Sequence, residues 1–282
     1  SNSSAASDVY KRQSLAYLGK EPVGAIPFDL RTLILAPGRT ARVAQENAVG
    51  VREEYRSRGI GTKMISAAAE FLADRCELLT VYRGAERSKG YNFYARTGHI
   101  DLLYLRRAEC RDAGNAASDV LVGGMDEIAA DAAEIRRLFE ACYGQMGGYP
   151  VRDADYWPQQ LKSHIYVVLP HEFIYLRYPA KGEMRSYAIL GRRLTGQEEA
   201  QTRLGIYELA AEDENAAAVV ISHAAHIASS RGLVLWTYLG WEHPFRNLML
   251  KLGFEEGLRF FMLMGRVISP QRLLTRAATD LE

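Results

Sequence analysis

The chain of 282 residues carries 35 basic and 34 acidic side chains and is 48% hydrophobic. This length and composition predict a globular protein of one or two domains with a sizeable core. A formal net charge of +1 gives no global field to gather nucleic acid or an anionic membrane, so neither is expected as a partner. No apolar run reaches the roughly 18 residues of a transmembrane helix, and the Ser/Ala-rich start lacks the apolar region of a secretory signal, so we expect a cytoplasmic protein.

Residues 1–13, SNSSAASDVYKRQ, show no apolar periodicity and are expected to be a tag remnant or disordered leader. Residues 14–35 then predict a hairpin of two strands around a Gly-Lys-Glu-Pro turn. Residues 41–51 predict a third strand, which leads through a glycine-containing turn into a helix. The apolar face expected for this helix consists of Ile60, Met64, Ala68, Phe71 and Leu72. A strand over 77–84, a short helix and a strand over 100–110 complete a β-β-β-α-β-α-β order.

A linker over residues 111–119 is followed by a second run of similar elements. They are expected as a helix at 126–144, strands at 164–179, 183–193 and 202–210, a helix at 214–232, a strand at 233–240, a helix at 244–253 and a strand around 258–268. We therefore predict an α/β (α+β) protein with two tandem domains, each a mixed, mostly antiparallel twisted sheet flanked by helices. The predicted domains are 14–111 and 119–270, with a tail at 271–282.

Three cysteines without Cys-x-x-Cys spacing argue against a disulfide framework and a structural zinc site. His223 and His226 are three residues apart on a predicted helix, but no third ligand motif accompanies them. No metal is expected.

The turn Arg56-Ser57-Arg58-Gly59-Ile60-Gly61 joins the third strand to a helix. Such a turn leaves unpaired backbone N–H groups at a helix N-terminus, where the helix dipole adds partial positive charge. Glycines let an anion approach the backbone closely, and Thr62 offers a hydroxyl donor. The segment therefore predicts a phosphate site. It lacks the Gly-Lys-Ser/Thr of a P-loop and the spacing of the dinucleotide fingerprint.

This turn resembles the acyl-CoA pyrophosphate loop of the GNAT acetyltransferase superfamily, Arg/Gln-x-x-Gly-x-Gly/Ala. Residues 92–99, NFYARTGH, are similar to the superfamily's second motif, Phe-Tyr-x-x-x-Gly-Phe, with His99 in place of the last residue. The resemblance implies direct transfer of an acetyl group from acetyl-CoA to an amine. Residues implied to bind the donor are Val49 and Val51 on the splayed strand and Arg56, Ser57, Arg58, Gly59, Ile60, Gly61 and Thr62 in the turn.

Two catalytic residues follow from the same resemblance. Tyr94 falls on the family's tyrosine, which protonates the departing thiolate, although an aromatic packing role beside Phe93 is the alternative. Glu46, late on the strand before the turn, is the candidate general base, and a solvated strand carboxylate explains it equally well.

The second copy lacks both the glycine-containing phosphate turn and the tyrosine. Its segment 206–220 has no glycine and carries four carboxylates, and Met249 stands at the position of the tyrosine. An active first domain followed by a degenerate one resembles the Eis-like acetyltransferases, in which a third domain follows, so the tail could begin such a domain. The acceptor, a small-molecule or peptide amine, and the oligomeric state, including a homo-oligomer, stay open. Alternatives are a non-catalytic CoA-binding scaffold and an aminoacyl-tRNA-dependent transferase of the same fold.

Overall fold

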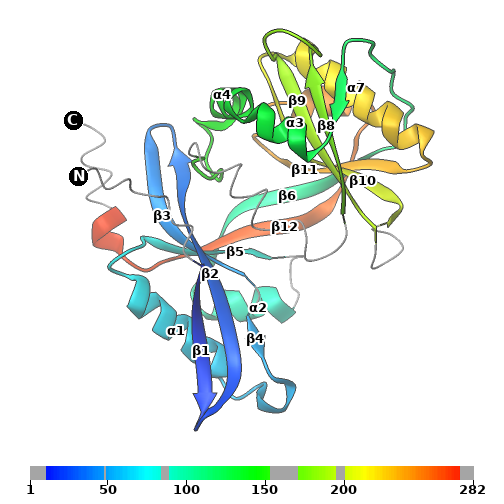
Figure 1. Cartoon of the computed structure of the whole chain (residues 1–282). Coiled ribbons are helices and arrows are strands. Elements are labelled where there is room, and N and C mark those ends of the chain that lie inside the picture. Colours follow the sequence, from blue (N-terminus) through cyan, green and yellow to red (C-terminus); the bar gives the residue numbers. More distant parts are fainter. Residues whose placement is uncertain (1–10, 48, 84–88, 153–170, 195–200, 274–282) are drawn as a thin grey trace. The chain divides into compact units, whose positions relative to one another are not determined.

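The structure, a computed structural model, describes residues 11–47, 49–83, 89–152, 171–194 and 201–273. The chain divides into two compact units (Figure 1). Unit 1 comprises residues 1–104, 145–151 and 259–282, and unit 2 comprises residues 105–144 and 152–258. Among the helices of the described residues, none is long and apolar enough to cross a membrane.

Unit 1 is a mixed sheet covered by helices (Figure 1). Its elements are β1 (Lys11–Leu18), β2 (Glu21–Ala36), β3 (Arg39–Glu46), β4 (Gly50–Val51), the 3₁₀ turn η1 (Glu53–Tyr55), α1 (Ile60–Leu72), β5 (Leu78–Arg83), α2 (Lys89–Arg96) and the last part of β12 (Glu255–Val267). The strand order is β1-β2-β3-β5-β12, and β4 pairs with β2 beside it. The pairings β1–β2, β2–β3, β2–β4 and β5–β12 are antiparallel, whereas β3 and β5 are parallel. The predicted mixed, mostly antiparallel class is confirmed.

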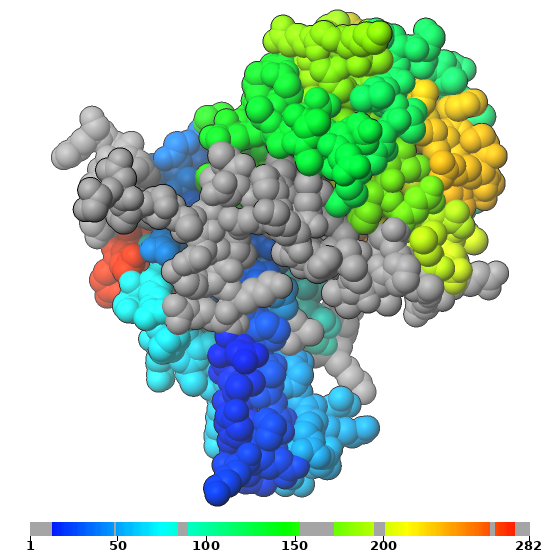
Figure 2. Space-filling view, viewed as in Figure 1, coloured from blue at the N-terminus to red at the C-terminus, as the bar shows by residue number. Residues whose placement is uncertain are grey.

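The predicted N-terminal hairpin is present, with Gly19 in the left-handed conformation (φ 62°) at its turn. β1 begins at Lys11, so the last three residues of the expected leader belong to a strand. Figure 2 shows β1, in dark blue, at the surface of unit 1. Leu15, Tyr17 and Leu18 are exposed on it.

Helix α1 packs its apolar stripe onto the sheet of unit 1. The buried residues are Met64, Ile65, Ala68, Ala69 and Leu72. The predicted face is therefore wrong at Phe71, which is 58% exposed and lies under the Arg75 guanidinium. The stripe is centred further round the helix, so that Ile65 rather than Phe71 faces the sheet.

The strands of unit 2 also pair in a mixed arrangement. Its elements are most of β6 (Ile100–Cys110), β7 (Leu121–Gly123), α3 (Met125–Ala130), α4 (Ala132–Tyr143), β8 (His171–Tyr178), β9 (Ser186–Arg193), β10 (Arg203–Ala211), α7 (Glu214–Ser230), β11 (Val234–Gly240), α8 (Arg246–Lys251) and the start of β12. The strand order is β6-β11-β10-β9-β8-β7, and β10 with β11 is the parallel pair. The single helix expected over 126–144 is two helices that meet at Asp131.

Strands β6 and β12 pass from one unit into the other. The second half of β6 pairs with β11 inside unit 2, and the end of β12 pairs with β5 inside unit 1. A strand expected to finish the second repeat therefore completes the sheet of the first unit. The repeat boundaries at 14–111 and 119–270 stay a prediction, since the compact units are not contiguous in sequence.

Candidate active site

A cavity opens in unit 1 where two parallel strands part. The register of β3 with β5 ends at Glu46 opposite Val81, whereas β5 continues to Arg83. Beyond Glu46 the chain stays bonded to β2, since Asn47 N–H donates to the Pro27 carbonyl over 3.0 Å, but it no longer pairs with β5. The predicted third strand therefore ends at Glu46 and not at Val51. The gap beyond it is a cavity of about 940 Å³, a volume typical of ligand pockets.

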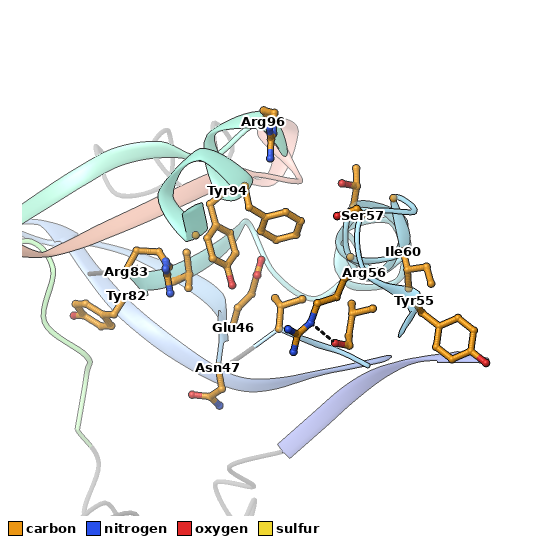
Figure 3. A pocket seen from close by; sticks show the side chains of 18 of the residues that line it. Glu46, Asn47, Tyr55, Arg56, Ser57, Ile60, Tyr82, Arg83, Tyr94 and Arg96 are labelled. Atoms are coloured by element: carbon orange, nitrogen blue, oxygen red, sulfur yellow. Dashed lines mark hydrogen bonds between the residues drawn. The ribbon is translucent and has the colours of Figure 1, made fainter. Parts of the chain in front are cut away.

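Strand β4 presents backbone groups to this gap. Arg52 N–H donates to the Val23 carbonyl of β2 over 3.0 Å. Because the backbone groups of an extended strand alternate in direction, the N–H and C=O of Val51 point away from β2. The carbonyl accepts a hydrogen bond from Arg56 Nε, 3.1 Å away (Figure 3). Val49 and Val51 both line the cavity, as predicted for residues that bind the donor.

The glycine-containing turn forms the cavity wall opposite the strands. Ser57 (φ 62°) and Gly59 (φ 75°) are left-handed, and Gly59 is the N-cap of α1. No side chain caps this helix, so its first N–H groups, those of Ile60, Gly61 and Thr62, lack intrahelical partners. The helix dipole adds partial positive charge at these free N–H groups, so the start of α1 suits an anion.

Gly61 has an additional role within the protein. A Cβ atom at this position would approach Phe93 Cζ to 3.1 Å. The absence of a side chain therefore lets α1 pack closely on the aromatic ring from α2. Packing against Phe93 is therefore a reason for glycine at position 61 that is separate from the close approach of an anion suggested by the motif.

Of the predicted donor-binding residues, all except Arg58 line the cavity. The Arg58 guanidinium instead lies 5.4 Å from the centre of the Tyr55 ring. Among the described lining residues the arginines are Arg56, Arg83 and Arg96, and the one carboxylate is Glu46. The cavity therefore has a local positive excess, although the whole chain is nearly neutral.

Tyr94 is placed by α2 at the inner end of the cavity, and only 4% of the residue is exposed. Figure 3 shows its hydroxyl and the Glu46 carboxylate pointing toward the same region. Burial raises the pKa of the Tyr94 phenol, and the negative charge of Glu46 raises it further, whereas Arg83 opposes the shift. The phenol therefore keeps its proton at neutral pH, as a proton donor must.

Glu46 is buried, which rules out the solvated carboxylate considered from the sequence. Its Oε1 lies 3.1 Å from His99 Nε2, and both side chains are fully excluded from solvent. The His99 ring also stacks edge to face with Tyr94, at a centroid distance of 5.2 Å. Tyr94 and Glu46, 48 residues apart in sequence, are thus brought to one wall with a third polar group that the motifs did not assign.

Several lining residues were missed from the sequence. They are Gln45, Asn47, Tyr55, Val81, Tyr82, Arg83, Gly90, Phe93 and Arg96. His99 was missed as a functional residue, but its departure from the second motif was a signal: a polar side chain stands where an apolar one is usual. Among the described residues, no group of three or more His, Cys, Asp or Glu side chains is placed to hold a metal ion.

In unit 2, the carboxylates at the N-terminus of α7 are paired with groups of the protein itself. Asp213 caps α7 by accepting a hydrogen bond from Ala216 N–H over 2.8 Å. That bond lowers the pKa of the Asp213 carboxyl. Arg185 contacts both Asp213 (2.6 Å) and Glu212 (3.4 Å). The helix N-terminus that would face a phosphate is therefore occupied by a carboxylate of the chain itself.

Glu208 and Met249, the other two residues of unit 2 that the sequence comparison singled out, also make their contacts within the protein. Glu208 pairs with Arg152 and accepts a hydrogen bond from the Tyr187 hydroxyl, each at 2.5 Å. Met249, at the position matching Tyr94, is fully buried in the apolar core.

Comparison with known families agrees with this division. The acetyltransferase (GNAT) family profile matches residues 6–99, which carry the turn, Glu46 and Tyr94. Residues 6–99 are therefore similar to the GNAT family. Among curated proteins, none matches the chain significantly.

Solved structures show that the GNAT-like fold extends over most of the chain. A probable N-acyltransferase of unknown function from Enterococcus faecalis has a TM-score of 0.68 at 14% identity, with 94% of this chain and 64% of that chain covered. Eis1 from Mycobacterium abscessus has a TM-score of 0.62 at 14% identity (94% and 66%). A tandem GNAT protein from the clavulanic acid biosynthesis pathway has a TM-score of 0.60 at 15% identity (91% and 82%). At these identities the likeness shows the fold.

The predicted resemblance to the GNAT superfamily and to Eis-like tandem proteins is therefore confirmed at the level of family and fold. The chain spans 64% of the Enterococcus faecalis protein and 66% of Eis1.

Proposed function

We propose that the protein is an acetyl-CoA-dependent N-acetyltransferase whose active site is the cavity of unit 1. The observation that carries the proposal is the meeting of three features on one cavity: an uncapped helix N-terminus, a buried tyrosine and a buried carboxylate. The similarity of residues 6–99 to the GNAT family supports acyl transfer as the reaction class.

The donor end of the site is the glycine-containing turn. The free N–H groups at the start of α1 would hold the pyrophosphate of acetyl-CoA, with Arg56 adding positive charge. The Val51 N–H, directed away from β2, would hydrogen-bond the pantetheine arm. Acetyl-CoA supplies an activated thioester, and this binding mode would place that thioester at the inner end, beside Tyr94.

Two side chains would carry the protons. Glu46 would take a proton from the acceptor ammonium, which frees the nitrogen lone pair to attack the thioester carbonyl. As the new C–N bond forms and the C–S bond breaks, Tyr94 would give its hydroxyl proton to the departing thiolate, and the second proton released by the nitrogen would return to the Tyr94 oxygen. The raised pKa of the phenol keeps this proton available before the reaction and suits it to an anionic sulfur.

The acceptor we propose is a primary amine of a small molecule or a peptide. Glu46 is the lining carboxylate among the described residues, and it attracts a cationic amine toward the inner end of the cavity. Polyamines, aminoglycoside-like amines, lysine side chains and N-terminal amines all meet this requirement.

Release of free CoA thiol from acetyl-CoA over a panel of these amines tests the proposal. Tyr94→Phe should lower kcat by about 100-fold or more, the usual contribution of a positioned general acid. Its affinity for acetyl-CoA should stay within about twofold, because only a hydroxyl is removed. Tyr17→Phe, on exposed β1 outside the cavity, is the matched control and should behave as the parent protein.

Each contrary outcome has a definite meaning. Binding of acetyl-CoA without thiol release on any amine would favour a non-catalytic CoA-binding protein. Equal turnover by the parent and Tyr94→Phe would remove Tyr94 from the mechanism.

A further inference from the structure

Glu46 and His99 form a buried pair at the inner end of the cavity. Glu46 is the last residue of β3, and His99 follows Gly98, directly before β6. Both side chains are fully buried, and Glu46 Oε1 lies 3.1 Å from His99 Nε2. The contact joins residues 53 positions apart, and both belong to unit 1.

The hydrogen bonds around His99 determine where its ring protons are. Thr97 Oγ1 lies 2.9 Å from the Tyr94 carbonyl, which can only accept, so the threonine hydroxyl donates there. The same Oγ1 lies 3.1 Å from His99 Nδ1. Since the single hydroxyl proton is already used, Nδ1 must carry a hydrogen and donate it to Thr97.

This assignment requires a proton between His99 and Glu46. A neutral ring protonated at Nδ1 has only a lone pair at Nε2, and an ionised carboxylate has no proton to offer. Two acceptors would then face one another at 3.1 Å between side chains that are excluded from solvent. One proton therefore lies between Nε2 and Oε1, either as imidazolium with carboxylate or as neutral imidazole with carboxylic acid.

The second carboxylate oxygen of Glu46, Oε2, is available to accept a hydrogen bond from a bound molecule. Glu46 Oε2 is buried and has no hydrogen-bond partner among the described residues. Glu46 lines the cavity, and Figure 3 shows its carboxylate directed toward the Tyr94 hydroxyl. A buried acceptor that makes no bond within the protein is costly unless a bound molecule donates to it.

We infer that His99 is a positioning residue for Glu46, which it orients through Oε1 so that Oε2 receives the proton of the acceptor ammonium. This inference rests on the proposed acetyl transfer. The N–H bond of the ammonium breaks, an O–H bond forms at Oε2, and the positive charge passes to the Glu46–His99 pair. The proton is returned to water when the acetylated product leaves.

Among the described residues, Tyr94 of α2 packs edge to face on the His99 ring, Arg83 of β5 interacts with Tyr94, and Asp29 of β2 accepts a hydrogen bond from Asn47 Nδ2 at 3.2 Å. The Arg266 side chain of β12 lies beside Gly98, next to His99. Arg83 and Asp29 are unchanged in the variants below, so a change in pH dependence would report the loss of His99.

The test compares His99→Phe with His99→Gln. Phenylalanine is the residue that usually ends the second motif, so it should pack, but it cannot hydrogen-bond to Glu46. Glutamine keeps an N–H donor for Oε1. We expect His99→Phe to lower kcat/KM for the amine by about 10-fold to 100-fold and to move the acidic limb of its pH profile about one unit higher. In His99→Gln, the decrease in log(kcat/KM) should be at most half of the decrease seen in His99→Phe.

Acetyl-CoA affinity, measured by calorimetry, should stay within about twofold of the parent value in both variants and so reports correct folding. Equal loss of kcat/KM in both variants with an unshifted acidic limb would overturn the inference, as would parental kinetics in His99→Phe. If the parent protein releases no thiol from any amine, the proposed function fails instead.

Nitrogen-15 NMR of the imidazole decides the proton arrangement without any turnover. His99 Nδ1 should be protonated in the parent protein and in Glu46→Gln. An Nε2 resonance that moves toward that of an unprotonated nitrogen in Glu46→Gln assigns imidazolium with carboxylate to the parent protein, whereas an unchanged Nε2 resonance assigns neutral imidazole with carboxylic acid. An unprotonated Nδ1 in the parent protein would overturn the inference.

Discussion

Gly59→Ala separates two roles of the glycine that precedes α1: its left-handed conformation affects stability, and the turn it forms directs the N–H groups expected to bind acetyl-CoA. Gly59 has φ 75°, and a Cβ atom built on it meets no heavy atom within 4 Å. The cost is therefore that of a left-handed L-residue, about 1–2 kcal/mol. Reduced freedom of the unfolded chain offsets about 0.4–1 kcal/mol of it. The net loss of about 1 kcal/mol corresponds to a fall of about 2–4 °C in Tm for a chain of this size.

Gly19→Ala is a matched control for stability. Gly19 has φ 62° and the same open surroundings, but it lies in the β1–β2 turn outside the cavity. Both variants should lose similar unfolding free energy in thermal and denaturant unfolding. In Gly59→Ala, relaxation of the turn should also misdirect the N–H groups at the start of α1. Loss of about one hydrogen bond to a charged group, roughly 1.5–3 kcal/mol, weakens acetyl-CoA binding by about 10-fold to 100-fold.

Calorimetric titration with acetyl-CoA measures this difference directly. If Gly59→Ala and Gly19→Ala keep the same affinity as the parent protein while both lose stability, the turn is not the anion site. An increase in stability for Gly59→Ala would refute the left-handed geometry itself.

Three further predictions concern packing, pH and charge. Ile65→Ala should lower the unfolding free energy by about 2–5 kcal/mol, whereas Phe71→Ala should change it by about 0.5 kcal/mol or less, as denaturant unfolding will show. Burial lowers the pKa of His243 to about 4, so the unfolded chain binds its proton more tightly. Stability should fall as the pH drops from about 6.5 to 4, and His243→Phe should flatten this dependence. Arg56→Ala should weaken acetyl-CoA binding more than Arg58→Ala, because only Arg56 lines the cavity; equal effects would contradict the geometry.

Local sequence patterns predicted most of the elements around the site. The hairpin, the helix after the turn and the short helix that carries Tyr94 all follow from turn residues, apolar period and a closing glycine. The turn residues that the motif assigns to the donor line the cavity, Arg58 excepted, and their binding of the donor stays a prediction. These features depend on contacts between residues close together in the chain.

Features set by distant contacts were not predicted. Beyond Glu46 the chain remains bonded to β2 but no longer pairs with β5, which no pattern in residues 41–51 reveals. The partner of Glu46 lies 53 residues away, so burial of that carboxylate could not be distinguished from exposure on a strand. Likewise, the pairing of β12 with β5 joins segments about 180 residues apart.

The central claim is that the cavity of unit 1 binds acetyl-CoA at the start of α1, and a comparison of Thr62→Glu with Ala67→Glu tests it most directly. Both residues are exposed on α1 and both variants add one negative charge, but only Thr62 lines the cavity. An acidic residue in the first turn suits the helix dipole, so Thr62→Glu should fold normally.

At about 5 Å, one added charge costs about 0.8–3 kcal/mol per phosphate charge. Calorimetry should therefore show parental affinity for acetyl-CoA in Ala67→Glu and at least tenfold weaker binding in Thr62→Glu. Equal affinity in both variants, or no binding by the parent protein, would contradict the account.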